Sequence, residues 1–267
     1  MNYQTDVIII GDSKEGYDVI KKLATEKPFI KIAFISRTFK STALREFLNV
    51  EYIKDEVVFT DYKNRLFGCY LKSGDRFYCT HLIVASGISY TPLIIEGKQI
   101  PGVFNEATNI NKTAKTLQAV VIGQNDADVK LALAVAKKYK HVYLCTKSIN
   151  LDITEACRKK LLNTENIVVL PNASIVKANT VEGVLKTVEL DNYSTLTCSA
   201  IFVKTETTPE TTFISDKLIN KSLDGYLITT EDLESTLVPK CFAIGNCAQK
   251  STKKMLGSMI EKILEDF

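Results

Sequence analysis

The sequence predicts an α/β protein made of two units that share one plan, with one unit nested inside the other. Each unit opens with an apolar strand, a turn containing glycine, a helix and a second apolar strand, which is a βαβ arrangement. These βαβ segments span residues 6–35 and 118–145. In each unit an antiparallel meander follows, and a further apolar strand then ends in glycine or a polar turn.

The elements of the first unit follow from apolar runs and turn residues. The all-apolar run at 7–10 is typical of a buried parallel strand, and Tyr17, Ile20 and Leu23 lie on one face of the following helix. A strand at 31–35 completes the βαβ segment. Further short strands are expected at 57–59, 66–71, 76–79 and 81–85.

The second unit repeats this order of patterns. Its strands and helices are expected at 118–122, 129–139, 141–145, 151–163, 187–190, 195–198 and 200–203. The chain then forms a last apolar strand at 240–246, which an amphipathic helix follows. The inward face of this helix is expected to carry Met255, Met259, Ile260, Ile263 and Leu264.

Composition and charge exclude several classes of protein. Of the 267 residues, 45% are hydrophobic and 24% are charged, which is typical of a globular chain and excludes a disordered one. The formal net charge of +3 creates no field that would attract nucleic acid or anionic lipid. Apolar runs such as Val7–Ile10 are far shorter than the ~20 residues of a membrane span. We therefore expect no nucleic-acid partner and no membrane.

The seven cysteines are expected to be reduced thiols in a reducing compartment, because no two of them form a C-x-x-C pair. The two histidines, His81 and His141, both adjoin apolar strands, so a His/Cys metal site is not expected. The chain enters its first strand at Asp6 without a stretch of the signal-peptide type. We expect a cytoplasmic protein.

The first glycine turn, residues 11–16, partly matches the dinucleotide-binding motif G-x-G-x-x-G. In that motif the first glycine makes the turn, the second lets the pyrophosphate approach, and the third lets the helix pack on the strand. Gly11 and Gly16 keep the first and third roles, and Ser13 holds the second. The Cβ of Ser13 would crowd a phosphate, whereas its hydroxyl could donate a hydrogen bond to one.

Charged residues in the same turn oppose phosphate binding. Asp12 and Glu15 bring negative charge to the phosphate position, and Lys14 partly offsets them. The acidic residue expected at the end of the second strand is absent, and Ser36 and Arg37 stand there. The turn is thus compatible with a pyrophosphate site and equally with a purely structural helix cap.

The second glycine turn keeps only its first glycine, Gly123. Asn125 takes the second motif position and Asp128 takes the third. Asp126 and Asp128 place two carboxylates at the start of the helix, which suits the helix dipole and repels a phosphate. We interpret this turn chiefly as a structural one, in which the carboxylates stabilise the helix where a ligand would otherwise have done so.

Seven landmarks follow one another along the chain, and their order and spacing together are more specific than any one of them. They are residues 7–16, 83–87, 101–103, 120–123, 202–203 with Pro209, 225–227 and 238–246. With these landmarks the chain resembles the low-molecular-weight thioredoxin reductases, which belong to the flavoproteins with two dinucleotide-binding domains. The resemblance spans nearly the whole chain.

The resemblance implies an α/β fold of two Rossmann-like three-layer domains, with the second domain inserted into the first. Residues 1–112 and 212–267 would form a discontinuous FAD-binding-like domain, and residues 113–211 would form an NAD(P)-binding-like domain. The resemblance also implies a homodimer, because the flavin domains of that family pair.

The chemistry of that family passes an electron pair from NADPH through FAD to a C-x-x-C disulfide, and this chain departs from it. Counting from Gly102, the two cysteine positions hold Glu106 and Asn109, which cannot form a disulfide. The family's H-R-R stretch, which grips the 2′-phosphate of NADPH, reads T-K-S at 146–148 and leaves one cation. NADPH binding is therefore not expected.

The flavin site that the resemblance implies is weakened but partly kept. Asn246 replaces an aspartate that accepts a hydrogen bond from the ribityl chain, and its neutral amide is a weaker acceptor. The link at 37–49 is shorter than in the family, where it helps cover the flavin ring. If FAD binds, the residues expected to hold it are Gly11, Ser13, Lys14, Gly16, Ser86, Gly87, Gly245 and Asn246.

Two functions remain open from the sequence. In the first, the chain is a non-catalytic or regulatory relative without dithiol–disulfide activity, without catalytic residues, and compatible with a protein partner. In the second, it is an FAD-dependent oxidoreductase that transfers electrons through flavin without an internal redox disulfide. A smaller third alternative is a pocket repurposed for another nucleotide or metabolite.

Overall fold

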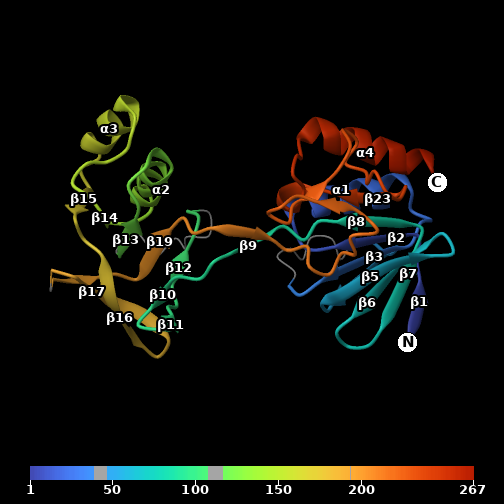
Figure 1. Ribbon diagram of the computed structural model, residues 1–267, viewed down its shortest axis with the longest axis horizontal. Coiled ribbons are helices and arrows are strands. Elements are labelled where there is room, and N and C mark those ends of the chain that lie inside the picture. The colour runs from blue at the N-terminus through green and yellow to red at the C-terminus, as the bar shows by residue number, and fades with distance from the viewer. Residues whose placement is uncertain (39–46, 108–116, 193) are drawn as a thin grey trace. The chain divides into compact units, whose positions relative to one another are not determined.

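The computed structural model describes residues 1–38, 47–107, 117–192 and 194–267. Contacts divide the chain into two compact units: unit 1 comprises Met1–Ser89 with Thr207–Phe267, and unit 2 comprises Tyr90–Glu206 (Figure 1). The chain leaves and re-enters unit 1 through β9 (Ile88–Tyr90) and β20 (Thr207–Pro209), which pair with each other.

A five-stranded parallel sheet forms the centre of unit 1, with the strand order β23-β8-β2-β3-β4. Its strands are β2 (Val7–Ile10), β3 (Ile32–Ser36), β4 (Val50–Lys54), β8 (His81–Val84) and β23 (Cys241–Ala243). Every residue of β2, β3 and β8 is buried. Burial of this kind is the pattern of parallel strands that are covered on both faces.

The two faces of this sheet are covered by different layers (Figure 1). Val7 and Ile9 of β2 pack in one core with α1 (Lys14–Glu26) and α4 (Lys253–Glu265). Ile8 and Ile10 pack in a second core with a four-stranded sheet. This sheet is an antiparallel meander of β5 (Val57–Lys63), β6 (Leu66–Leu71) and β7 (Arg76–Cys79), to which β1 (Asn2–Gln4) is added in parallel beside β7. Unit 1 therefore has three layers.

Short elements complete unit 1 around the ends of the sheet. They are the paired strands β21 (Asn220–Lys221) and β22 (Leu227–Ile228) and the 3-10 helix η2 (Gly245–Cys247). η2 follows β23 directly and precedes α4, so it lies next to the carboxyl end of the central sheet.

Unit 2 has the same construction around a five-stranded parallel sheet of order β12-β19-β13-β14-β15. Its strands are β12 (Val103–Phe104), β13 (Gln118–Ile122), β14 (His141–Thr146), β15 (Ile167–Pro171) and β19 (Ala200–Val203). Helices α2 (Asp126–Ala136) and α3 (Glu155–Leu162) pack with Ala119 and Val121 on one face.

The other face of the unit 2 sheet packs against antiparallel strands, with Val120 and Ile201 in the shared core. These strands are β16 (Ile175–Val181), β17 (Val184–Leu190) and β18 (Thr195–Thr197), with the hairpin of β10 (Ile94–Ile95) and β11 (Lys98–Gln99). The fold class expected from the sequence, an α/β protein with two Rossmann-like three-layer domains, is confirmed.

The unit boundaries fall at 89/90 and 206/207, whereas the sequence placed domain boundaries at 112/113 and 211/212. Residues 90–107 pack with unit 2 because Ile95 and Ile100 are buried in its core and β12 pairs with β19. The expected boundary at 112/113 itself lies outside the described residues.

Candidate functional site

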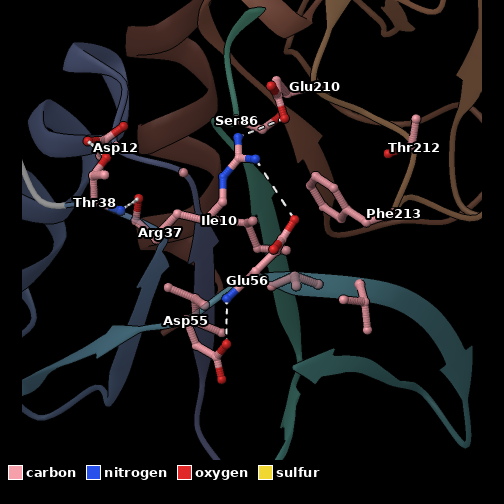
Figure 2. Close-up of a pocket in the computed structure, with 15 residues that line it drawn as sticks. Ile10, Asp12, Arg37, Thr38, Asp55, Glu56, Ser86, Glu210, Thr212 and Phe213 are labelled. Carbon is pink, nitrogen blue, oxygen red and sulfur yellow. Dashed lines mark hydrogen bonds and ion pairs between the residues drawn. The ribbon is translucent and has the colours of Figure 1, made fainter. Parts of the chain in front are cut away.

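A cavity of about 280 Å³ lies in unit 1 beside the carboxyl ends of β2 and β3 (Figure 2). Its walls come from the turn at Gly11, the segment after β3, the start of β5, Ser86, and the segment at 210–213. Ligands of open α/β sheets bind at this edge, outside the carboxyl ends of the strands. The cavity is therefore the candidate site of unit 1.

Arg37 connects two distant segments across this cavity. Figure 2 shows its guanidinium between the carboxylates of Glu210 and Glu56, at N–O distances of 2.8 Å and 3.8 Å. Lys72 Nζ also lies 3.1 Å from Glu56 Oε2. In dinucleotide sites this position carries an acid that binds a ribose hydroxyl, or an arginine that accepts a 2′-phosphate. In this chain the guanidinium pairs with the protein's own carboxylates.

The described residues that line the cavity include four carboxylates and one guanidinium. The carboxylates belong to Asp12, Asp55, Glu56 and Glu210. Burial alone would raise the pKa of Asp55, yet hydrogen bonds from Ser73 and from the Glu56 N–H hold it below its usual value. Asp55 is therefore ionised at neutral pH, and the lining disfavours an anionic ligand.

The first glycine turn packs tightly against the end of β8. Gly11 has φ +97°, and a Cβ there would lie 2.5 Å from the carbonyl oxygen of Ala85. A Cβ on Gly16 would lie 3.1 Å from the Cβ of Ala85. Ser13 caps the start of α1, and its Oγ accepts a hydrogen bond of 3.1 Å from the Gly16 N–H. The two glycines thus allow turn, helix and strand to approach closely, and ligand binding by this turn stays a prediction.

Side chains of the same turn face Gly245 of η2. A Cβ on Gly245 would lie 3.0 Å from Glu15 Oε2 and 3.5 Å from Ser13 Oγ. The N–H of Gly245 donates a hydrogen bond of 3.1 Å to Ser251 Oγ. Glu15 and Ser13 therefore take up space between the start of α1 and η2, where the resemblance places a flavin pyrophosphate.

The other expected flavin residues are positioned differently. Lys14 and Asn246 are exposed. Gly87 has φ +73° and open space around its α-carbon. The Oγ of Ser86 is buried and has no hydrogen-bond partner among the described residues. Because an unsatisfied buried hydroxyl costs roughly 1–3 kcal/mol, Ser86 is the part of this wall that favours a bound polar group.

The second glycine turn, in unit 2, is bonded internally. Asp128 Oδ2 accepts hydrogen bonds from the N–H groups of Gln124 and Asn125, at 2.9 Å and 3.2 Å. Asn125 Oδ1 accepts from the N–H groups of Ala127 and Asp128, at 2.8 Å and 3.1 Å. Asp126 lies apart from this pair and accepts a 2.7 Å hydrogen bond from the N–H of Thr154.

All seven cysteines are buried free thiols. Burial raises the pKa of Cys145, Cys198 and Cys241 to about 12. Burial also raises the pKa of Cys69 and Cys79, which lie on neighbouring meander strands. These thiols are protonated at neutral pH, whereas thiol exchange and metal binding use the thiolate.

The two positions at which the resemblance places the family's cysteines hold Glu106 and Asn109. Glu106 Oε1 accepts a 2.9 Å hydrogen bond from the hydroxyl of Tyr90. Burial, together with this carboxylate, raises the pKa of Tyr90 to about 12. Asn109 lies outside the described residues. Within the described ranges, no group of three or more His, Cys, Asp or Glu side chains could hold a metal ion.

The parallel sheets, the glycine turns at their carboxyl edges and the cavity beside Gly11 define a protein of the dinucleotide-binding α/β class. A family model described as pyridine nucleotide-disulphide oxidoreductase matches residues 6–259. The chain belongs to this family. No helix in the described part of the chain is both long and apolar enough to cross a membrane.

Individual relatives and solved structures agree with this assignment. The chain is 26% identical over 244 residues to a thioredoxin reductase of Chlamydia pneumoniae, covering 84% of this chain and 74% of that one. Its fold matches the crystal structure of Lactococcus lactis thioredoxin reductase, with a TM-score of 0.69, 18% identity and coverage of 98% and 100%. It also matches T. acidophilum thioredoxin reductase, with a TM-score of 0.71, 14% identity and coverage of 98% of both chains. The resemblance to the low-molecular-weight thioredoxin reductases is confirmed.

Proposed function

We propose that the chain is a non-catalytic member of its family, without dithiol–disulfide activity, that acts as a regulatory or scaffold protein. The observation that carries this proposal is the state of its cysteines. None of them forms a C-x-x-C pair, and all seven are buried. Disulfide exchange needs an accessible thiolate. Burial raises the pKa of Cys145, Cys198 and Cys241, so these thiols are protonated at neutral pH.

We propose in addition that unit 2 takes no nicotinamide dinucleotide. The N–H groups of Gln124 and Asn125, which would face a pyrophosphate, already donate to Asp128. Lys147 is the one cation in the stretch that replaces the family's pair of arginines. The residues present therefore do not fit a nicotinamide dinucleotide.

The test is an absorbance spectrum of the protein purified without added cofactor, followed by thermal unfolding with FAD, NADH and NADPH. We expect a colourless protein whose melting temperature does not respond to any of them. A true ligand at a hundred times its Kd would add about 2.7 kcal/mol of stability, which is readily detected. NADPH-dependent reduction of a disulfide dye, corrected for the reaction of the protein alone, would overturn the proposal.

A second candidate function is that of an FAD-dependent oxidoreductase, and unit 1 supplies the observations in its favour. The cavity borders Gly11, and the Oγ of Ser86 is buried without a partner in the described structure. The N–H groups of Lys14 and Glu15, in the first turn of α1, also make no hydrogen bond to another described residue. Helix starts of this kind bind phosphates.

If FAD binds, Gly11, Ser13, Lys14 and Gly16 would hold its pyrophosphate, and Asn246 would accept a hydrogen bond from its ribityl chain. Bound FAD would supply two-electron transfer. The side chain of Glu15 would have to leave Gly245 for this to occur, because it lies in contact distance of that glycine. Flavin absorbance that persists after incubation with FAD and gel filtration would favour this candidate over the non-catalytic one.

A further inference from the structure

We infer that the carboxylate of Asp128 is an internal substitute for a bound phosphate in unit 2, and that it keeps nucleotides out of the second glycine turn. This inference deepens the proposal that unit 2 takes no nicotinamide dinucleotide, and it assigns the exclusion to one residue.

The hydrogen bonds of Asp128 are those that a phosphate oxygen would make. Its Oδ2 accepts from two successive backbone N–H groups, those of Gln124 and Asn125, at 2.9 Å and 3.2 Å. The turn follows β13 and leads into α2, whose first residue is Asp126. Backbone N–H groups at the start of a helix that follows a strand are the phosphate donors of dinucleotide folds. Here both donors are used by the chain itself.

The carboxylate also fills the space that the ligand would need. A Cβ built on Gly123 would overlap the carboxylate of Asp128. The carboxylate therefore lies against the α-carbon of the one motif glycine that remains. Asp128 is only 6% exposed, so a phosphate cannot approach the turn unless this side chain moves.

Asn125 completes the closure from the second motif position. Its Oδ1 accepts from the N–H groups of Ala127 and Asp128. The two residues that replace motif glycines, Asn125 and Asp128, thus satisfy four N–H groups of the turn. A glycine at 128 would leave the N–H groups of Gln124 and Asn125 for a ligand, and a glycine at 125 would leave that of Ala127.

The first glycine turn, in unit 1, provides the contrast. Its third motif position is still glycine, Gly16, and its second is Ser13, whose Oγ bonds one N–H group. The N–H groups of Lys14 and Glu15 have no acceptor within the described residues. The same motif is therefore closed in unit 2, where the third glycine has become an aspartate.

A simpler interpretation is that Asn125 and Asp128 form only a capping box that stabilises α2. The two interpretations differ in one outcome. Removal of a plain cap lowers stability and creates nothing new. Removal of a phosphate substitute lowers stability and also creates an anion site.

The experiment compares Asp128→Ala with Asp126→Ala in the full chain. Asp126 lies at the same helix start and carries the same charge, but it bonds Thr154 and not the turn. Binding of inorganic pyrophosphate and of NADPH is measured by titration calorimetry at fixed ionic strength, and folding is checked by circular dichroism. We expect at least tenfold tighter pyrophosphate binding for Asp128→Ala than for the natural chain, and no gain for Asp126→Ala.

Three results would overturn the inference. The first is no gain with folded Asp128→Ala, and the second is an equal gain with Asp126→Ala, which would mean that charge alone excludes the anion. The third needs no variant: amide hydrogens of Gln124 and Asn125 that exchange as fast as exposed ones would show that Asp128 does not hold them. NADPH binding by the natural chain would instead refute the broader proposal about unit 2.

Discussion

At the scale of single residues, His81 makes the stability of unit 1 depend on pH. It is 1% exposed, with Nε2 2.9 Å from Asp266 Oδ2 and Nδ1 2.9 Å from Thr80 Oγ1. Burial lowers the pKa of His81, although the hydrogen bond to Asp266 opposes the change. Burial would raise the pKa of Asp266, but hydrogen bonds from His81 and Lys240 hold it below its usual value.

We expect the free energy of unfolding to fall as the pH is lowered from about 7 to about 5. Unfolded His81 binds a proton with the ordinary pKa of 6.5, whereas folded His81 binds it only at lower pH. The stabilisation is complete above the unfolded pKa and is lost as the pH falls through the folded pKa. Asp266 acts in the same direction at still lower pH, because its folded pKa is also lowered.

Urea midpoints at several pH values check this expectation in the natural chain, His81→Gln and His141→Gln. His141 is exposed at the start of β14 and serves as the matched control. His81→Gln should flatten the pH dependence, and His141→Gln should leave it unchanged. If all three profiles coincide, protonation of His81 is not the source.

A second prediction concerns two glycines with opposite surroundings. Gly11→Ala should lower the free energy of unfolding by more than about 2 kcal/mol, because it combines a left-handed backbone with a Cβ placed 2.5 Å from a carbonyl oxygen. Gly257→Ala in α4 should raise it by roughly 0.5–1 kcal/mol, because the helix gains a better helix former in open space. Chemical denaturation measures both, and equal stability of Gly11→Ala and the natural chain would show that the turn can relax.

At the scale of elements, each α-helix in the described part of the chain is preceded by a polar residue whose side chain bonds its first turn. These residues are Ser13, Asn125, Thr154 and Thr252. Asn125 differs from the others because its side chain accepts two N–H groups and its own N–H is bonded by Asp128. α2 is therefore the helix whose start depends most on side chains.

We expect Thr252→Ala to lower the free energy of unfolding by about 1 kcal/mol, which is typical for loss of one cap. Asn125→Ala should lower it by more, because the Asn125 side chain accepts hydrogen bonds from two N–H groups, at 2.8 Å and 3.1 Å, and the second of these is partly buried. Parallel denaturation curves of the two variants test the order. A smaller effect for Asn125→Ala would mean that water replaces its bonds without loss.

At the scale of the whole molecule, the cysteines behave as core residues. Cys69, Cys79 and Cys241 belong to one core of unit 1, and Cys157 and Cys198 lie in the two cores of unit 2. Reaction with a thiol reagent therefore requires local or global opening of the fold.

We predict that a thiol-reactive dye labels few of the seven cysteines in the native protein and all seven in denaturant. The slow native rate should rise with urea, because it reports opening rather than thiol chemistry. Absorbance of the released dye follows the reaction. Two thiols that react rapidly in the native protein would contradict the buried arrangement and reopen the question of dithiol activity.

Much of this fold can be predicted from the sequence, because the central strands are continuous apolar runs. The sequence predicts four of these strands at their observed positions, namely β2, β3, β8 and β13. Strands that are covered on both faces contain few polar residues, so they stand out in the sequence. Two strands at the sheet edges, β4 and β15, have no counterpart among the strands expected from the sequence. In β4 the charged residues Glu51 and Lys54 interrupt the apolar run, and most of its residues are exposed or half-buried. β15 is an apolar run, but it is short and not fully buried, and no turn of the dinucleotide-binding type follows it to mark it as a strand.

The candidate site was less predictable, because its key contacts join residues far apart in the chain. The sequence shows that Arg37 replaces an acid, but its partner Glu210 is 173 positions away and has no local signal. The sequence also shows carboxylates at the start of α2. That Asp128 folds back over Gly123, while Asp126 bonds Thr154, depends on side-chain geometry that no spacing rule supplies.

The ends of unit 2 meet, since the N–H of Thr91 donates a 2.9 Å hydrogen bond to the carbonyl oxygen of Glu206. An insert whose first and last residues touch can be cut out and its host rejoined by a short loop without stretching either piece. We therefore expect that unit 1 and unit 2 can each be produced as a separate protein, so that comparing the free energy of unfolding of unit 1 alone with that of the full chain measures what unit 2 adds to its stability.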